Sequence, residues 1–82
     1  ISIHPNPGNG RINVRYSIES ASSIKFEIYD ITGKMIYSSP SYYQQKGSHI
    51  EMIDIKDAQS GVYNLLLKIG GKVITKKLII HK

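Results

Sequence analysis

The sequence contains no cysteine, and this absence excludes disulfide bonds, thiolate metal ligands and cysteine nucleophiles. It also contains no tryptophan and a single phenylalanine among 82 residues, so its aromatic side chains are mainly its six tyrosines. For chains of this size, apolar burial and the entropy cost of ordering nearly cancel. We therefore expect one domain of modest stability.

Long apolar runs are absent as well. The longest runs, such as Leu65–Leu67 and Leu78–Ile80, contain three residues, whereas a membrane-spanning helix needs about 20. We therefore expect no membrane insertion. The chain begins with Ile1 rather than methionine, and we expect residues 1–82 to be a single domain of a longer precursor, with any signal peptide lying upstream.

What the sequence does contain is a regular alternation of apolar and polar residues, the pattern of half-buried β-strands. The alternation is clearest over Ile12–Ile18 and Ile24–Ile28. In the second segment Lys25 and Glu27 are expected to point outward, away from the core. One face of each strand would then contact a core and the other would contact water, as antiparallel sheets allow.

Turn-forming residues separate the strand segments. Pro5–Gly10 must turn, because proline fixes φ and glycine accepts positive φ. Asp30–Gly33 predicts a tight turn into the next strand, with room for a type I turn or a bulge. Gly70-Gly71 suits a two-residue hairpin turn between the last two strands, Tyr63–Ile69 and Val73–Ile80.

The segment from His49 to Ile55 has no clear phase. Ile50 and Met52 occupy one parity, whereas Ile53 and Ile55 occupy the other. Either both faces of this strand are covered, or a bulge shifts the register. We predict a bulge at Met52-Ile53.

Counting the opening segment Ile1–His4, about seven short strands alternate with turns, which favours an all-β fold, an immunoglobulin-like antiparallel β-sandwich, over a barrel. Tyr63 stands at the start of the penultimate strand, where such sandwiches place a corner tyrosine whose hydroxyl bonds to upstream backbone. An ordinary core tyrosine is the alternative. Gly61 would resist replacement by valine if its φ were positive.

No group of residues has the spacing that catalysis or metal binding requires. His4, His49 and His81 lie far apart, and the aspartates are scattered among turns. The serines lack a nucleophile-elbow setting, and Pro5–Gly10 lacks the spacing of a phosphate-binding loop. We therefore expect no enzymatic activity, no metal and no cofactor.

Positive charge is concentrated at the end of the chain. The net charge is +5, and Lys72, Lys76, Lys77 and Lys82 fall within the last eleven residues. Such a stripe attracts anions. No aromatic residue is interleaved with these lysines as a stacking platform for bases, so we expect no nucleic-acid binding. Lysines on an edge strand also suppress aggregation.

Tyr37, Tyr42 and Tyr43 form a local aromatic group. Exposed tyrosines occur at carbohydrate and protein contacts, because they combine apolar area with a polar tip. Tyr42 and Tyr43 are adjacent and would point to opposite faces of one strand, so at most one belongs to the core. This group leaves open an alternative function, an accessory carbohydrate-binding or spacer β-sandwich of an extracellular enzyme.

The chain also carries short motifs at its start, centre and end. They are Pro5-Asn6-Pro7, Phe26–Lys34 with its Gly33, Gly61-Val62-Tyr63, Gly70-Gly71-Lys72 and Lys76-Lys77-Leu78. In this order, and over nearly the whole chain, they resemble the type A C-terminal sorting domain of the type IX, or Por, secretion system. The resemblance implies a sorting motif made of Pro5, Asn6, Pro7, Gly33, Gly61, Tyr63, Gly70, Gly71, Lys72, Lys76 and Lys77.

The resemblance implies a non-catalytic domain that directs an attached cargo protein across the outer membrane of Bacteroidetes-type bacteria. In similar proteins the cargo passes through the periplasm and is recognised by translocon and shuttle components. A sortase-like peptidase then removes the domain, and the cargo remains at the cell surface or is released. Ala58 departs from the family's usual leucine and is expected to thin the core beneath its loop, and His81 is not a favoured terminal residue.

Overall fold

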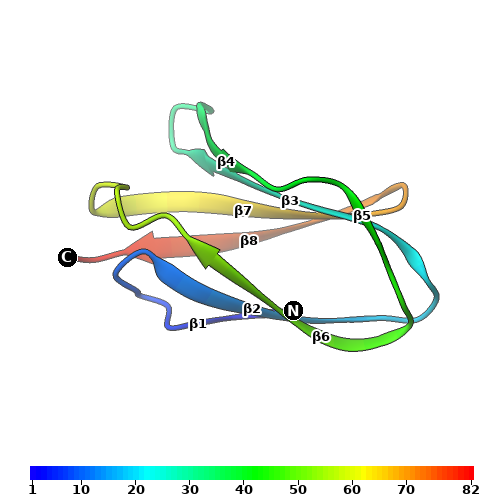
Figure 1. Cartoon of the computed structure of the whole chain (residues 1–82). Coiled ribbons are helices and arrows are strands. Elements are labelled where there is room, and N and C mark those ends of the chain that lie inside the picture. Colours follow the sequence, from blue (N-terminus) through cyan, green and yellow to red (C-terminus); the bar gives the residue numbers. More distant parts are fainter.

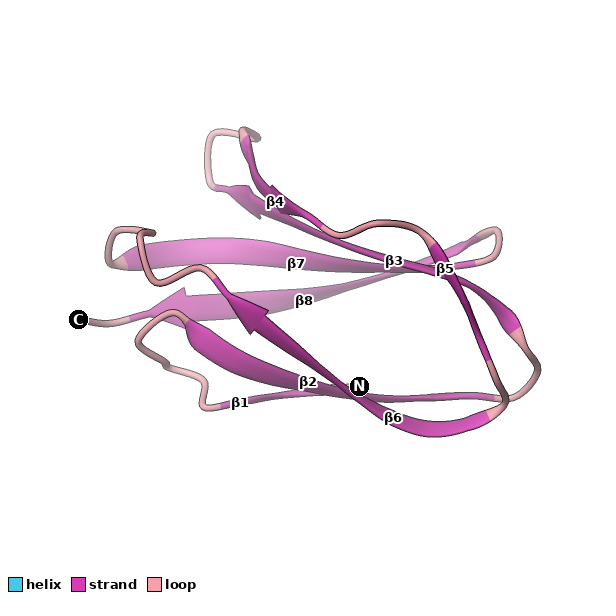
Figure 2. Cartoon of the chain, viewed as in Figure 1, coloured by secondary structure: helices cyan, strands magenta, loops and turns pink.

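The structure is a computed structural model that describes all of residues 1–82. It is all-β, with two antiparallel sheets that face each other (Figures 1 and 2). The eight strands are β1 (Ser2–His4), β2 (Arg11–Ile18), β3 (Ser22–Asp30), β4 (Met35–Ser38), β5 (Tyr42–Gln44), β6 (Gly47–Asp54), β7 (Gly61–Ile69) and β8 (Lys72–Ile80). The predicted sandwich is confirmed, and none of its segments is a helix of the length and apolarity that crossing a membrane demands.

The two sheets differ in size. The smaller has the strand order β1-β2-β6, and the larger has the order β4-β3-β7-β8, with β5 also paired to β3. β4 pairs with Glu27–Tyr29 and β5 pairs with Ser22–Ile24, so together they form one edge strand with an interruption. The strand that the sequence did not predict is β5, which Pro40 separates from β4.

The side chain of Ser39 bridges this interruption. Its Oγ accepts a hydrogen bond from the backbone N–H of Phe26 at 2.9 Å, and its own N–H donates to the carbonyl of Phe26 at 2.9 Å. Phe26 therefore keeps its backbone partners although the strand is broken. Pro40 has no N–H to offer, and it is tolerated here because the strand lies at a sheet edge.

The alternation of apolar residues correctly predicted the core. Fifteen buried apolar side chains contact one another between the sheets, and Phe26 packs edge-on against Tyr16 with ring centroids 5.5 Å apart. The fifteen are Ile3, Ile12, Val14, Tyr16, Ile18, Ile24, Phe26, Ile28, Ile53, Ile55, Tyr63, Leu65, Leu67, Leu78 and Ile80.

The predicted bulge at Met52-Ile53 is wrong. β2 and β6 pair without any shift in register, from Arg11 opposite Asp54 to Ile18 opposite Gly47. Met52 therefore points outward and is 80% exposed, and Ile50 is 57% exposed. The register shift that does occur lies between β3 and β4, at Ile28/Tyr29, next to the turn for which a bulge was one of the expected geometries.

Polar partners explain why β6 can turn its apolar residues outward. His49 and Glu51 share the inward parity with the buried Ile53. The His49 ring lies over Tyr16 with centroids 5.5 Å apart, and Glu51 Oε1 accepts a hydrogen bond from the Tyr42 hydroxyl at 2.8 Å. The hydrogen bond from Tyr42 satisfies a carboxylate that would otherwise be costly on an inward face, and His49 Nε2 lies 2.7 Å from the carbonyl oxygen of Gln45.

On the outer face of the larger sheet, Lys25 and Glu27 point away from the core as predicted, but Glu27 is only 3% exposed. Its carboxylate lies 3.0 Å from Lys68 Nζ and 3.7 Å from Lys25 Nζ, and it accepts a hydrogen bond from the Tyr29 hydroxyl at 3.0 Å. The hydrogen bond from Lys68 is the main cause that lowers the pKa of Glu27. The buried carboxylate is therefore held in its charged form.

Candidate functional site

Pro5–Gly8 and the last strand come from opposite ends of the sequence and lie side by side. After β1 the chain leaves the smaller sheet and reaches the edge of β8 in the larger one (Figure 1). The Asn6 side chain bonds there to backbone: Nδ2 donates to the carbonyl of Lys77 at 3.0 Å, and Oδ1 accepts from the N–H of Ile79 at 3.0 Å. One amide side chain thus takes the place of a paired strand.

Gly8 continues this pairing with its own backbone. Its N–H donates to the carbonyl of Ile79 at 2.9 Å, and its carbonyl accepts from the N–H of His81 at 2.8 Å. A Cβ at Gly8 would lie 2.7 Å from the carbonyl oxygen of Pro5, so a larger residue would displace the segment. We refer to Asn6–Gly8 paired with Lys77–His81 as the terminal clamp.

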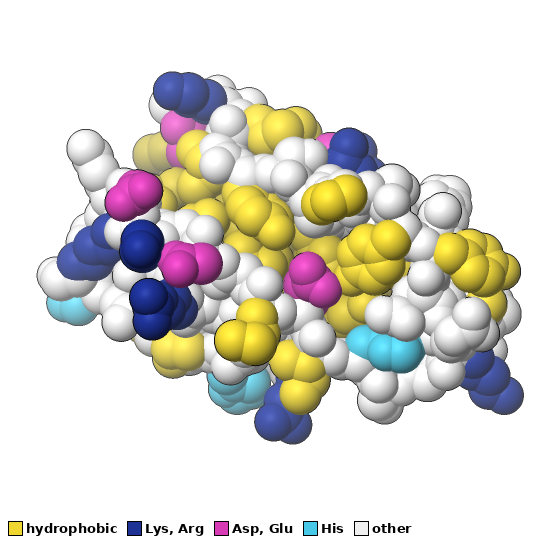
Figure 3. All heavy atoms as spheres, viewed as in Figure 1, with side chains coloured by type: hydrophobic (Ala, Val, Ile, Leu, Met, Phe, Trp, Pro, Cys, Tyr) yellow, Lys and Arg dark blue, Asp and Glu magenta, His cyan; other side chains and the backbone are white.

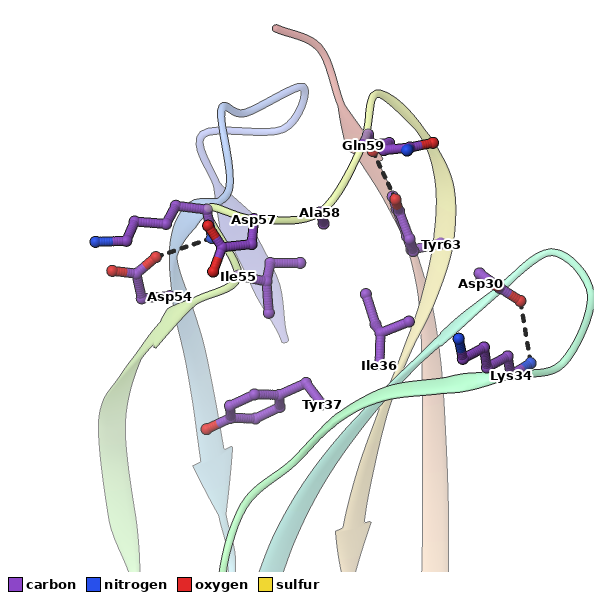
Figure 4. A pocket seen from close by; sticks show the side chains of 11 residues that line it. Asp30, Lys34, Ile36, Tyr37, Asp54, Ile55, Asp57, Ala58, Gln59 and Tyr63 are labelled. Carbon is purple, nitrogen blue, oxygen red and sulfur yellow. Dashed lines mark hydrogen bonds between the residues drawn. The ribbon is translucent and has the colours of Figure 1, made fainter.

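Tyr63, on β7, lies at the same end of the sandwich as the terminal clamp. Its hydroxyl donates to the carbonyl of Gln59 at 2.5 Å, and its ring is buried (Figure 4). This bond to upstream backbone confirms the predicted corner tyrosine. In the β7–β8 ladder Tyr63 lies opposite Leu78, within the stretch of β8 that the terminal clamp holds.

The residue after the clamp is also fastened. The N–H of Lys82 donates to Ser60 Oγ at 3.0 Å, and Lys82 Nζ donates to the carbonyl of Lys56. Both partners belong to the loop between β6 and β7. The end of the chain is therefore held by the N-terminal segment on one side and by this loop on the other.

The motif residues lie in three places: at one end of the sandwich, at the other end, and along β8 between them. Pro5–Pro7, Gly33, Gly61 and Tyr63 lie at the end where the C-terminus emerges (Figure 1). Gly70, Gly71 and Lys72 form the hairpin turn at the opposite end. Lys76 and Lys77 lie between the two ends, along β8.

Asp30 explains the structure of the turn at Gly33, which has a φ of +89°. Its Oδ1 accepts three hydrogen bonds, from Thr32 Oγ1 at 2.6 Å, Thr32 N–H at 2.9 Å and Lys34 N–H at 3.0 Å. The bond from the Thr32 hydroxyl is the main cause that lowers the pKa of Asp30. This part of the motif is fully engaged in its own turn.

The two other glycine motifs behave differently. Gly61 does not adopt a positive φ, and a Cβ there would meet only Tyr63 Cε1 at 4.0 Å, so the backbone reason for a clash with valine is absent. Gly70 has a φ of +57° and begins the two-residue turn between Ile69 and Lys72, which confirms the predicted hairpin.

The three lysines of the motif are exposed on β8 and do not form one row. Lys72 and Lys76 lie opposite Ile69 and Leu65, on the parity that faces the other sheet, whereas Lys77 is on the outer parity. None of the three takes part in an ion pair. β8 therefore presents uncompensated positive charge on both of its sides.

We compared the sequence with models of known protein families. The model of one family, described as the secretion system C-terminal sorting domain, matches residues 2–81. The chain belongs to this family. The match covers both halves of the terminal clamp and the hairpin between them. Domains of this family are type IX secretion sorting signals and are generally non-catalytic. No curated protein matches the chain.

Sequence reasoning missed part of the clamp of this sorting domain. Gly8 was interpreted only as a turn residue, and Asn6 as a motif residue without a structural role. A signal was present in the sequence, because Asn6 stands between two prolines that have no N–H. The Asn6 side chain adds a donor and an acceptor to a segment in which both neighbouring residues lack a backbone donor.

The tyrosine group of the sorting domain does not form one surface. Tyr43 is 67% exposed, whereas Tyr42 turns inward, and burial is the main cause that raises its pKa. The expectation that at most one of these two belongs to the core is confirmed. Tyr37 is partly buried and lines a separate pocket.

That pocket, of about 660 Å³, opens between the β3–β4 turn and the β6–β7 loop (Figure 4). Apolar side chains are visible in the hollow on this side, with acidic and basic side chains around them (Figure 3). Asp30, Asp54 and Asp57 line it. Asp30 and Asp54 accept backbone hydrogen bonds, and no group of three acidic or histidine side chains is placed to hold a metal ion.

Ala58 lines this pocket and packs partly buried against the core. We expect Ala58→Leu to raise the free energy of unfolding by about 1 kcal/mol, because the added carbons would cover Ile55 and Ile36, which line the same pocket. The measurement is thermal melting followed by circular dichroism, where this gain corresponds to a rise of about 4–8 °C. Ala58→Ser is the matched control. A melting temperature of the leucine variant equal to or lower than that of the unmodified chain would contradict the prediction.

Proposed function

We propose that this chain is a non-catalytic signal that directs an attached cargo protein across the outer membrane. Membership of the family makes it a type IX sorting signal that acts with the secretion machinery and leads to export to the cell surface or the medium. The observation that carries the proposal is the family match, which extends over residues 2–81 and so over nearly all of the chain.

Within the motif, we propose a division between residues that shape the domain and residues that are recognised. Asn6, Gly33 and Tyr63 are engaged in bonds or turns of the domain itself. Lys72, Lys76 and Lys77 are exposed and have no ion-pair partner. The last hairpin, β7–β8, is therefore the proposed contact with the translocon.

The proposed route begins with a cargo fused on the N-terminal side of residues 1–82, in a Bacteroidetes-type bacterium. The cargo reaches the periplasm through its own signal, and translocon and shuttle components recognise the folded domain there. A sortase-like peptidase cuts near the N-terminal edge. A cut ahead of β1 would leave the terminal clamp intact, because the clamp begins at Asn6.

We also propose that the sandwich is immunoglobulin-like. The Tyr63 corner supports this relationship, as does the division of the strands into a β1-β2-β6 sheet and a β4-β3-β7-β8 sheet. The carbohydrate-binding alternative receives less support, because Tyr42 and Tyr43 point to opposite sides of β5 and Tyr37 lies in a different pocket.

The proposal is tested by fusing residues 1–82 to a fluorescent protein that carries an inner-membrane signal, in a bacterium with the type IX system. We expect fluorescence outside the cells, and retention in a translocon-deficient strain and in a matched fusion without the domain. Retention of the complete fusion in the parent strain, with the domain folded and intact, would contradict the sorting proposal. A glycan array with a Tyr43→Ala control would then test carbohydrate binding.

A further inference from the structure

β8 is the outer strand of its sheet, and the terminal clamp covers only its last part. The two-residue turn pairs Lys72 with Ile69, so Lys72 and every second residue after it bond to β7. The clamp is consistent with this phase, because it bonds to Lys77, Ile79 and His81. The residues between the turn and the clamp that face away from β7 are therefore Val73 and Thr75.

The backbone groups of Val73 and Thr75 have no partner on that side. No strand other than β7 pairs with β8. Neither residue takes part in the backbone hydrogen bonds that lie outside the strand ladders. Val73 is 55% exposed, and Thr75 is exposed as well. We call the Lys72–Lys76 part of β8 the open edge. An unpaired row of this kind is a template for another strand.

The side chains along the open edge determine which charge is favoured on a strand that pairs with it. On the inner parity, Lys72 and Lys76 flank the partly buried Ile74, and on the outer parity Val73 and Thr75 precede Lys77. Glu19 is the one acidic residue in the depression of about 450 Å³ beside Lys72 and Ile74, and it forms no ion pair with either lysine. Carboxylates directly opposite lysines in paired strands are stabilising, and like charges are destabilising.

A second copy of the chain is a poor occupant for the same reason. Two β8 strands paired through their open edges would place lysines of one copy near lysines of the other, since Lys72, Lys76 and Lys77 border the edge on both parities. An acidic strand would instead pair these charges and satisfy the backbone groups together.

We propose that the open edge binds an extended acidic segment of another protein by strand addition. Carboxylates of that segment lie opposite Lys72 and Lys76 on one face and opposite Lys77 on the other, and an apolar side chain lies opposite Ile74. The terminal clamp limits the added strand, because Asn6 already occupies the carbonyl of Lys77. This inference rests on the proposed sorting function and gives the chemistry of the partner segment.

The test uses the ¹⁵N-labelled 82-residue chain and the acetylated peptide Glu-Glu-Thr-Val-Val-Glu, whose glutamates fall opposite Lys77, Lys76 and Lys72 in antiparallel register. The reversed peptide tests the parallel register. We expect saturable shifts and slower hydrogen exchange at the amides of Val73, Thr75 and Lys77. A peptide with lysine in place of each glutamate should bind about tenfold more weakly or worse.

Two variants separate strand addition from simple charge attraction. Thr75→Pro removes an N–H of the open edge that is not bonded to β7, so the fold should remain while peptide binding is lost. Lys72→Glu with Lys76→Glu should weaken binding by about tenfold or more. Lys34→Glu with Lys46→Glu makes the same change in net charge elsewhere and should have little effect.

The following results would overturn the inference. They are the absence of shifts with either peptide at millimolar concentration, binding that Thr75→Pro leaves unchanged, and self-association through β8 in place of peptide binding. Binding of an anionic polysaccharide to the same lysines without amide protection would also overturn it, since it would show an anion site without strand addition.

The export assay distinguishes this inference from the proposed function. If the unmodified fusion is not exported, the sorting function fails whatever the peptide shows. If the unmodified fusion is exported and the fusion with Lys72→Glu and Lys76→Glu is exported equally well, the sorting function stands and the open edge is not its recognition element.

Discussion

We expect removal of Lys77–Lys82 to abolish export of a fused cargo, while the cargo itself remains folded in the periplasm. The deletion takes away Leu78 and Ile80, which are 0% and 1% exposed, and leaves Asn6 and Gly8 without partners. Loss of a single buried leucine or isoleucine side chain costs about 2–5 kcal/mol. Two such losses approach or exceed the whole stability of a small domain, which is about 5–15 kcal/mol.

The measurement is cell fractionation of a fluorescent fusion, with fluorescence read in the medium and in the periplasm. The matched control replaces His81 and Lys82 by alanine, because this change keeps the backbone N–H groups that bond to Gly8 and Ser60. The control should still be exported. Truncated cargo in the medium at the level of the unmodified fusion would contradict the proposed role of the terminal strand.

We expect Asn6→Ala to lower the free energy of unfolding by about 1–3 kcal/mol, because two hydrogen bonds to the backbone of β8 are lost and their partners lie at a sheet edge. Urea denaturation measures this loss. Hydrogen exchange should accelerate at Ile79, whose N–H donates to Asn6 Oδ1, and much less at Leu78, which pairs with β7.

Asn9→Ala provides the control in the same loop. Asn9 Oδ1 accepts only a local bond, from the N–H of Arg11 at 3.2 Å, so its loss should cost less. Asn6→Asp gives an intermediate case, since a carboxylate accepts from Ile79 but cannot donate to the carbonyl of Lys77. Equal effects of the alanine substitutions at Asn6 and Asn9 would show that the clamp does not stabilise the end of β8.

The functional part of the molecule was only partly predictable from sequence. The motif residues Gly70 and Tyr63 received correct structural roles, because a two-residue glycine turn and a corner tyrosine are recognisable from short stretches of chain. Asn6 and Gly8 did not, because their partners lie more than 70 residues away. The lysines were expected to form a charged stripe on the last strand, and their division between two faces required the register of β8.

The strands around the core were determined by the sequence itself. A period of two along Ile12–Ile18 and Ile24–Ile28 commits each residue to one face, and this is a property of the local chain. Burial between the sheets follows, because apolar area on one face must be covered.

The tertiary structure alone decided which face of β6 is buried and what the opening segment of the chain contacts. Ile50 and Met52 point outward because Tyr16 and Tyr42 offer partners to the polar residues on the opposite parity, and those tyrosines lie on other strands. Asn6 pairs with Ile79 across 73 residues of sequence. A hydrogen-bond partner at that distance depends on how the two sheets are placed together, which no local pattern of residues specifies.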